Sequence, residues 1–149
     1  MSSTAVVEKL VVRRVIAAPA KDLFDAWLDA KAMAVWMKPG DAERSDVTVD
    51  ARVGGRFEIV MHTPRGAIPH RGVYEVIDRP RRLAFTWNSP YAGEHGSLVT
   101  VDFLARAGGT EVVLTHEKLP TEIAVGQHRG GWTDALASLA SYGESAQRG

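Results

Sequence analysis

The chain has 149 residues, 45% of them hydrophobic and 24% charged, and 18 basic side chains balance 18 acidic ones. This length suits one domain that can fold without a disulfide or a metal. The neutral balance argues against a dedicated nucleic-acid binder, and the absence of cysteine excludes disulfides, thiol nucleophiles and thiolate metal sites.

The first forty residues predict one strand and two short helices. β-branched residues predict a strand over about 8–17. Pro19 suits the first turn of a helix, and the apolar residues after it recur at helical spacing. Asp29 is placed to cap a second short helix, which Pro39 and Gly40 would end.

Alternation of apolar and polar residues then predicts six strands. We expect them at about 45–51, 56–62, 71–77, 82–87, 97–105 and 110–118. Glycine pairs at 54–55 and 108–109 predict tight turns, and the segments 63–69 and 88–96 are predicted as loops. Neighbouring strands joined by short turns form an antiparallel sheet.

From Thr121 the apolar spacing becomes helical and continues through Trp132 to Leu139. Gly130 and Gly131 inside this helix imply a bend or the close approach of another backbone. We therefore predict a single α+β domain over 8–143, with loose termini at 1–7 and 144–149. The one long helix is expected to cover one face of the antiparallel sheet.

The sequence also carries predictions about location and assembly. The first seven residues lack the basic and apolar segments of a signal peptide, and no run approaches 18 consecutive apolar residues. These features predict a cytoplasmic protein without a membrane span. The first strand, if it lies at a sheet edge, could pair with a second copy in a homodimer.

Several short fragments resemble a known family when they are taken in order. They lie at 16–19, 23–27, 36–39, 53–57, 72–76, 83–87, 109–111, 114–117 and 128–132. Together they resemble the activator of heat shock protein 90 ATPase homologue-like (AHSA-type) family of the START-like, or SRPBCC, superfamily over about residues 9–142.

This resemblance implies a helix-grip fold, in which a curved antiparallel sheet wraps around a long C-terminal helix and leaves a cavity. Members of the superfamily bind lipids, sterols or polyketides, and some are cyclases. The eukaryotic co-chaperones of the family carry an additional N-terminal chaperone-binding domain. A first strand near residue 8 leaves no room for that domain, which argues against chaperone association.

Seven aromatic residues are expected to point inward from the strands and helices. They could line an apolar ligand cavity, with Met61 as adaptable padding and with Tyr74 and the indole N–H groups as polar contacts. They could equally be ordinary core. The seven are Trp36, Phe57, Tyr74, Phe85, Trp87, Phe103 and Trp132.

Two histidines share faces with this apolar set. His116 lies on the face of Val112 and Leu114, and His128 lies one helical turn before Trp132. They could contact a ligand or act as acid and base, or they could be structural residues that hold the helix against the sheet. No third ligand accompanies them at a spacing that zinc requires, so neither a metal nor a cofactor is expected.

The leading hypothesis is the binding of a small hydrophobic ligand, of lipid, sterol, polyketide or aromatic type, between the sheet and the last helix. One alternative is a small cyclase- or hydrolase-type enzyme that uses His116 or His128 together with Tyr74. The other is a co-chaperone-like interaction protein in a stress response.

Overall fold

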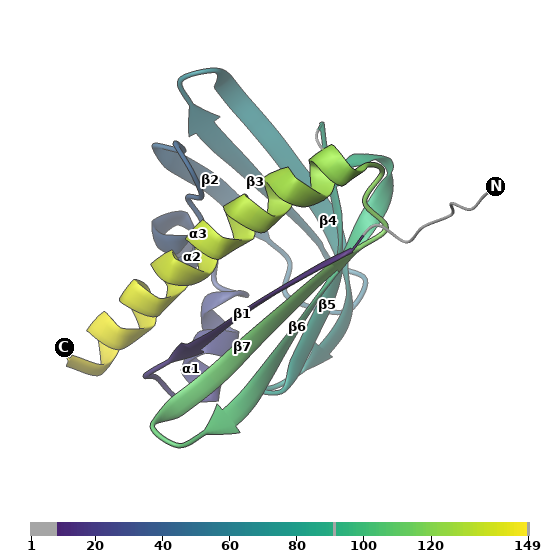
Figure 1. Cartoon of the computed structure of the whole chain (residues 1–149). Helices are drawn as coiled ribbons and strands as arrows, with labels where there is room; N and C mark the ends of the chain where they lie inside the picture. The colour runs from purple at the N-terminus through teal and green to yellow at the C-terminus, as the bar shows by residue number, and fades with distance from the viewer. Residues whose placement is uncertain (1–8, 91, 149) are drawn as a thin grey trace.

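The computed structural model describes residues 9–90 and 92–148. A first strand and two short helices are followed by six strands and a long helix (Figure 1). The elements are β1 (Leu10–Ile16), α1 (Ala20–Ala26), α2 (Ala30–Trp36), β2 (Arg44–Val49), β3 (Arg56–Thr63), β4 (Gly66–Asp78), β5 (Arg82–Ser89), β6 (Gly93–Arg106), β7 (Gly109–Glu117) and α3 (Glu122–Arg148). This order confirms the predicted α+β helix-grip architecture.

All seven strands form one antiparallel sheet in the order β1-β7-β6-β5-β4-β3-β2. Strands β2 to β7 are consecutive neighbours, whereas β1 pairs with β7 at the far end. The sheet curves, and α3 runs diagonally across its concave side, with α1 and α2 beside it (Figure 1). The two sheet edges, β1 and β2, therefore lie on opposite sides of α3.

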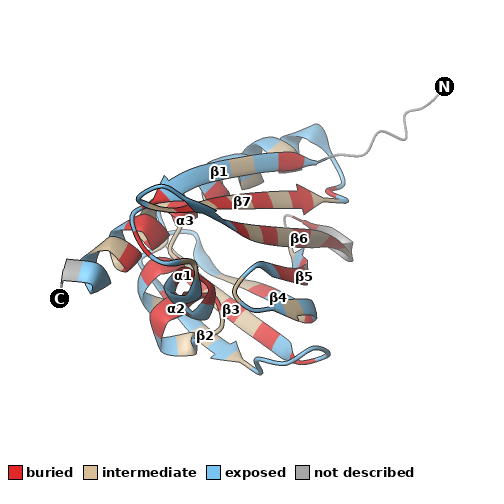
Figure 2. Ribbon diagram, turned by 90° about the horizontal axis from the view of Figure 1, so that it is seen from below, coloured by how far each residue is buried: buried red, intermediate tan, exposed pale blue. Residues whose placement is uncertain are grey.

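The core lies between the concave face and the helices. Buried residues alternate along the strands with exposed or half-buried ones (Figure 2). On β5 the buried set includes Leu83, Phe85 and Trp87, which is the face that the alternation predicted. The helix α3 contributes Trp132 and Leu136 to the same core. None of the helices in the described ranges is both long and apolar enough to cross a bilayer.

Gly72 on β4 shows how closely this core is packed. A Cβ at this position would overlap the carbonyl oxygen of Thr86 and lie 2.5 Å from Cζ of Phe57. The missing side chain thus lets the Phe57 ring lie over β4, where its centroid is 5.3 Å from that of Tyr74. Phe57 on β3 and Tyr74 on β4 thus pack with their rings tilted by 46° to each other.

The hairpin of β3 and β4 is longer than the sequence indicated. The prediction of a loop over 63–69 is wrong, because β3 reaches Thr63 and β4 begins at Gly66, so that only Pro64 and Arg65 form the turn. Pro69 is tolerated because β4 has no partner on its other side until Arg71 pairs with Asn88. The loop predicted over 88–96 is also shorter, since β6 begins at Gly93.

The C-terminal helix extends beyond its predicted end. Its last turns remain helical to Arg148, where a loose tail was expected from residue 144. Glu144 accepts a hydrogen bond from the backbone N–H of Ala17 at 3.1 Å, and Gln147 donates to Asp22 at 2.9 Å. These contacts hold the end of α3 against the start of α1. The predicted loose segment 1–7 lies outside the described residues.

The cap of α2 supports a first prediction. The Asp29 carboxylate accepts a hydrogen bond from the backbone N–H of Lys31 at 2.9 Å, as the sequence predicted, with a longer contact to Ala32. We expect Asp29→Ala to lower the free energy of unfolding by about 1 kcal/mol in a urea titration. Asp29→Ser should restore most of the loss, and equal stability of the alanine variant and the original protein would contradict the capping role.

Candidate functional site

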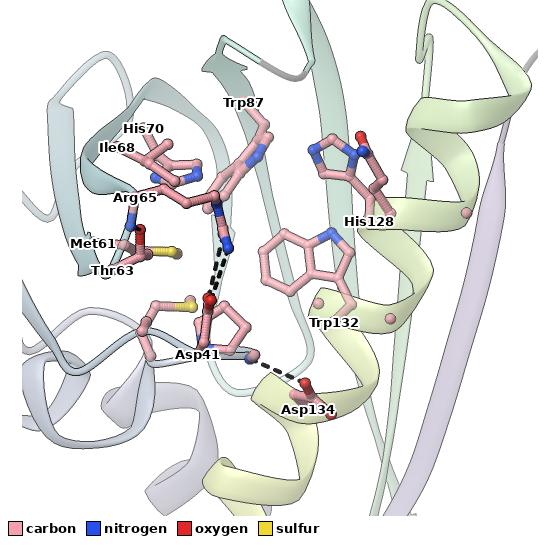
Figure 3. A pocket seen from close by; sticks show the side chains of 18 residues that line it. Asp41, Met61, Thr63, Arg65, Ile68, His70, Trp87, His128, Trp132 and Asp134 are labelled. Atoms are coloured by element: carbon pink, nitrogen blue, oxygen red, sulfur yellow. Dashed lines mark hydrogen bonds and ion pairs between the residues drawn. The ribbon is translucent and has the colours of Figure 1, made fainter.

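A cavity of about 510 Å³ opens between α3, the tip of the β3–β4 hairpin and the loop after α2 (Figure 3). Small-molecule sites in proteins commonly have volumes of this order. Its lining comes from four separate parts of the chain: Met37, Pro39, Gly40, Asp41 and Ala42; Met61, Thr63, Arg65, Ile68 and His70; Trp87; and Gly126, Gln127, His128, Gly130, Gly131, Trp132 and Asp134. The fold brings these stretches together only when the sheet wraps around α3.

The inner wall of the cavity is mostly apolar. Met37, Met61, Trp87 and Trp132 are all buried, and Ile68 is half-buried. The Trp87 and Trp132 rings lie with their centroids 4.9 Å apart. Two methionines and two indoles form a surface that suits an apolar ligand, because methionine adapts to irregular shapes.

Glycines form the helical wall. A Cβ at Gly126 or Gly130 would meet no other atom within 4 Å, and one at Gly131 would lie 3.9 Å from Cβ of Pro39. The helix therefore presents bare backbone to the cavity at a propensity cost of about 1 kcal/mol per glycine. α3 continues as one helix through this stretch, and Gly130 and Gly131 both line the cavity.

Two polar contacts tie the loop after α2 across the opening (Figure 3). Arg65 at the hairpin tip contacts Asp41 through both guanidinium nitrogens, at 2.7 and 3.3 Å. The backbone N–H of Gly40 donates to Asp134 on α3 at 3.0 Å. The hydrogen bond from Arg65 lowers the pKa of Asp41 below its ordinary value. Both contacts are exposed, so each contributes little to stability and can open readily.

His116 lies behind the cavity wall at the centre of a hydrogen-bonded chain. The indole N–H of Trp132 donates to Nδ1 of His116 at 2.9 Å. Nε2 of His116 must then carry the proton and donate to the Ser97 hydroxyl at 2.6 Å, and this hydroxyl donates to the carbonyl oxygen of Trp87 at 2.7 Å. The indole N–H, both imidazole nitrogens and the Ser97 hydroxyl are all paired in this hydrogen-bonded series, so His116 joins α3 to the sheet.

His128 presents one ring nitrogen that could serve a ligand. Its Nδ1 donates to the carbonyl oxygen of Ala124 at 2.7 Å, which leaves Nε2 as an acceptor. No described residue forms a hydrogen bond with that atom. Burial lowers the pKa of His128, so the ring is neutral at pH 7. The centroid of its ring is 4.9 Å from that of His116, so the two histidines meet where α3 crosses the sheet.

His70 lines the cavity although the sequence analysis did not single it out. Its Nδ1 donates to the carbonyl oxygen of Ile59 at 3.2 Å, and its ring centroid lies 5.0 Å from that of Trp87. Burial lowers its pKa to about 4. The signal was the inward alternation of Ile68, His70 and Gly72, which a loop assignment up to Pro69 concealed.

The structure distributes the other candidate residues over several places. Met61, Trp87, His128 and Trp132 line the cavity. Phe57, Tyr74 and Phe85 surround a second, much smaller void that Trp87 also borders. Trp36 donates its indole N–H to the carbonyl oxygen of Ala26, and Phe103 packs edge-on against Phe24, so both belong to the core rather than to the cavity.

The arrangement is better suited to binding than to acid–base chemistry. Both nitrogens of His116 are engaged, and burial lowers its pKa to about 3. Tyr74 does not line the larger cavity. No group of three His, Asp or Glu side chains that could hold a metal occurs among residues 9–90 and 92–148.

The sequence matches a known family, and the fold matches several solved structures. Residues 17–144 match the family described as "Activator of Hsp90 ATPase homolog 1-like protein". A crystal structure of a Chromobacterium violaceum protein has 25% sequence identity and a TM-score of 0.84, covering 92% of this chain and 97% of that one.

Two further solved structures show the same likeness. An AHSA1-like protein from Aeromonas hydrophila has 26% identity and a TM-score of 0.72, covering 93% of this chain and 94% of its own. A Rhizobium leguminosarum protein has 26% identity and a TM-score of 0.74, covering 94% and 96%. A search of the curated proteins found no match.

Proposed function

The chain belongs to the activator of Hsp90 ATPase homologue 1-like family, and we propose that it binds a small, mostly apolar ligand in the cavity between α3 and the sheet. The observation that carries this proposal is an open volume of about 510 Å³ with an apolar inner wall. A protein interior normally fills such space with side chains. Here three glycines on α3 leave it free.

The polar groups of the cavity indicate how such a ligand would be oriented. Nε2 of His128 is an acceptor at the helical wall, while Asp41, Arg65 and Asp134 surround the opening. A ligand with an apolar body and a polar end toward the opening would satisfy both regions. Lipid-, polyketide- and aromatic-type molecules have this character.

The enzyme alternative has less support from the same residues. His116 is neutral and fully paired, and Tyr74 belongs to the smaller void. Among residues 9–90 and 92–148, Nε2 of His128 has no hydrogen-bond partner and no acidic side chain is paired with the ring. This set favours recognition of a ligand over its conversion.

A substitution on α3 tests the proposal. In Gly130→Leu, the new side chain would extend into open cavity space and would replace a helix-disfavouring residue, so the variant should fold at least as well as the original protein. We expect 1-anilinonaphthalene-8-sulfonate, measured by its fluorescence, to bind at least ten-fold more weakly to this variant. Native mass spectrometry should show an apolar compound on the original protein only.

A matched control adds the same side chain elsewhere on the helix. Ser141 is exposed on α3 and does not line the cavity, so Ser141→Leu should leave the affinity for the dye unchanged. Equal binding of the dye to both leucine variants would place the dye outside the cavity. A protein that purifies empty and binds no apolar probe would overturn the proposal.

A further inference from the structure

A second void lies deeper in the molecule, against the inner wall of the cavity. Its volume is about 10 Å³, and its lining is Trp27, Met33, Met37, Phe57, Ile59, Tyr74, Phe85 and Trp87. Only three of these side chains carry a nitrogen or oxygen atom: Trp27, Tyr74 and Trp87. All three residues are at most 3% exposed.

The same three side chains share a second property. Nε1 of Trp27, the hydroxyl of Tyr74 and Nε1 of Trp87 are the buried side-chain nitrogen and oxygen atoms that lack a hydrogen-bond partner among the described residues. Buried polar groups are nearly always paired, because an unmade hydrogen bond destabilises the fold. Because the three residues with unpaired donors all line one void, a group from outside the chain that occupies it is suited to satisfy them.

The chemistry of that group follows from the lining. An indole N–H can only donate, and burial raises the pKa of Tyr74, so its hydroxyl keeps its proton. The remaining side chains are hydrocarbon or thioether. The void therefore suits a hydrogen-bond acceptor, and its volume is close to that of one water-sized oxygen.

This void adjoins the larger cavity. Met37 and Trp87 line both spaces, so these two side chains form the wall between them. Methionine has three rotatable bonds and repacks easily, which allows a group on a ligand to reach past Met37. The two spaces can thus serve one ligand, with the apolar body in the cavity and one atom in the void.

We propose that the void is an inner subsite that receives an acceptor oxygen, supplied by a carbonyl or ether group of the ligand and by a water molecule when no ligand is bound. The inference rests on the proposed function and adds the ligand class: an apolar molecule with an oxygen acceptor at its inner end. A hydrocarbon of the same shape leaves the three donors unpaired and binds more weakly.

A matched pair of ligands tests this selectivity. 1-Tetralone and tetralin differ by one carbonyl oxygen on the same fused rings. We expect calorimetric titration to give at least ten-fold tighter binding of 1-tetralone, and Tyr74→Phe to reduce that preference several-fold. Tyr142→Phe, which removes a hydroxyl outside both voids, is the control and should keep the preference.

The possible results separate the two proposals. Equal affinity for both compounds, unchanged in Tyr74→Phe, would overturn the oxygen subsite and leave the apolar site standing. Binding of neither compound, together with failure of the dye to bind, would count against the ligand cavity itself.

The ligand-free protein gives a second test, which depends on the sign of a stability change. If water occupies the void, Tyr74→Phe removes a hydrogen bond and should lower the melting temperature by about 2–4 °C relative to Tyr142→Phe. If the void is dry, the substitution removes an unpaired hydroxyl and should raise the melting temperature, which would overturn the inference.

Magnetisation transfer distinguishes the two sources of the oxygen. In the free protein, the indole N–H signals of Trp27 and Trp87 should show a nuclear Overhauser effect to a long-lived water molecule. Saturation with 1-tetralone should abolish this effect and replace it with contacts to the ligand. Persistence of the water signal in the saturated protein would overturn the claim that the ligand oxygen enters the void.

Discussion

Lowering the pH from 7 to 5 should reduce the free energy of unfolding by about 4 kcal/mol. The cause is a pair of histidines that are buried without a compensating negative charge. His70 is 7% exposed and His116 is fully buried. Burial, with a smaller contribution from the charge of His128, lowers their pKa values to about 4 and about 3.

The direction of this effect follows from proton binding in the two states. In the unfolded chain both rings take up a proton near pH 6.5, whereas in the folded protein they stay neutral until the pH falls to about 4 or 3. Their contribution is therefore fully present above pH 6.5 and is lost as the pH falls below it. Each ring loses about 1.4 kcal/mol per pH unit in that range, and 1.5 units for two rings gives about 4 kcal/mol. His128, whose pKa is also lowered by burial, acts in the same direction.

Urea titrations at pH 7 and pH 5 measure this loss directly. Glutamine does not titrate, so His70→Gln and His116→Gln should each remove about half of the pH dependence, whatever they do to stability at pH 7. Hydrogen bonds from Arg79 and Arg65 lower the pKa values of Asp25 and Asp41 below their ordinary range, so these carboxylates do not contribute between pH 7 and pH 5. An undiminished pH dependence in both glutamine variants would show that these rings are not its source.

The fold was largely predictable because apolar residues alternate with more exposed ones along most of β3 and β7. On β5 the large apolar residues Leu83, Phe85 and Trp87 recur at every second position and are buried. The spacing changes to that of a helix at Thr121, whose hydroxyl accepts the backbone N–H of Ala124 at 3.0 Å. The strand boundaries were predicted wrongly where proline and glycine residues suggested loops. Pro69 indicated a loop, but it lies where β4 has no neighbour on one side, and only the pairing of strands reveals that.

The candidate site was predictable only in part, because alternation shows that a residue faces inward but not what it meets there. Trp36 and Phe103 follow the same pattern as Trp87, yet the first two pack against other residues and the third borders the open space. The cavity arises mainly where side chains are missing. Gly126, Gly130 and Gly131 mark this wall in the sequence, although the same pattern is compatible with a bend.

Trp132 should be among the side chains whose loss costs the most. Its ring centroid lies 4.9 Å from that of Trp87 and 6.1 Å from that of Trp27. Its indole N–H donates a hydrogen bond to Nδ1 of His116 at 2.9 Å. Trp132→Ala should lower the free energy of unfolding by about 3–5 kcal/mol, measured by urea titration, because it removes a large buried ring beside an existing cavity. Retention of full stability would mean that α3 is held by contacts other than this one.

A double-mutant cycle separates the hydrogen bond from the packing of the ring. Trp132→Phe keeps an aromatic ring but leaves Nδ1 of His116 as a buried acceptor without a donor, and His116→Leu leaves the indole N–H unpaired. Replacing both partners removes both unpaired groups, so the double variant should be more stable than the sum of the single losses predicts, by about 1–3 kcal/mol. Strict additivity would show that Trp132 acts through packing alone. A coupling of the expected size would identify the chain from Trp132 through His116 to Ser97 as the contact that fixes the position of the glycine-lined helix, and with it the width of the cavity.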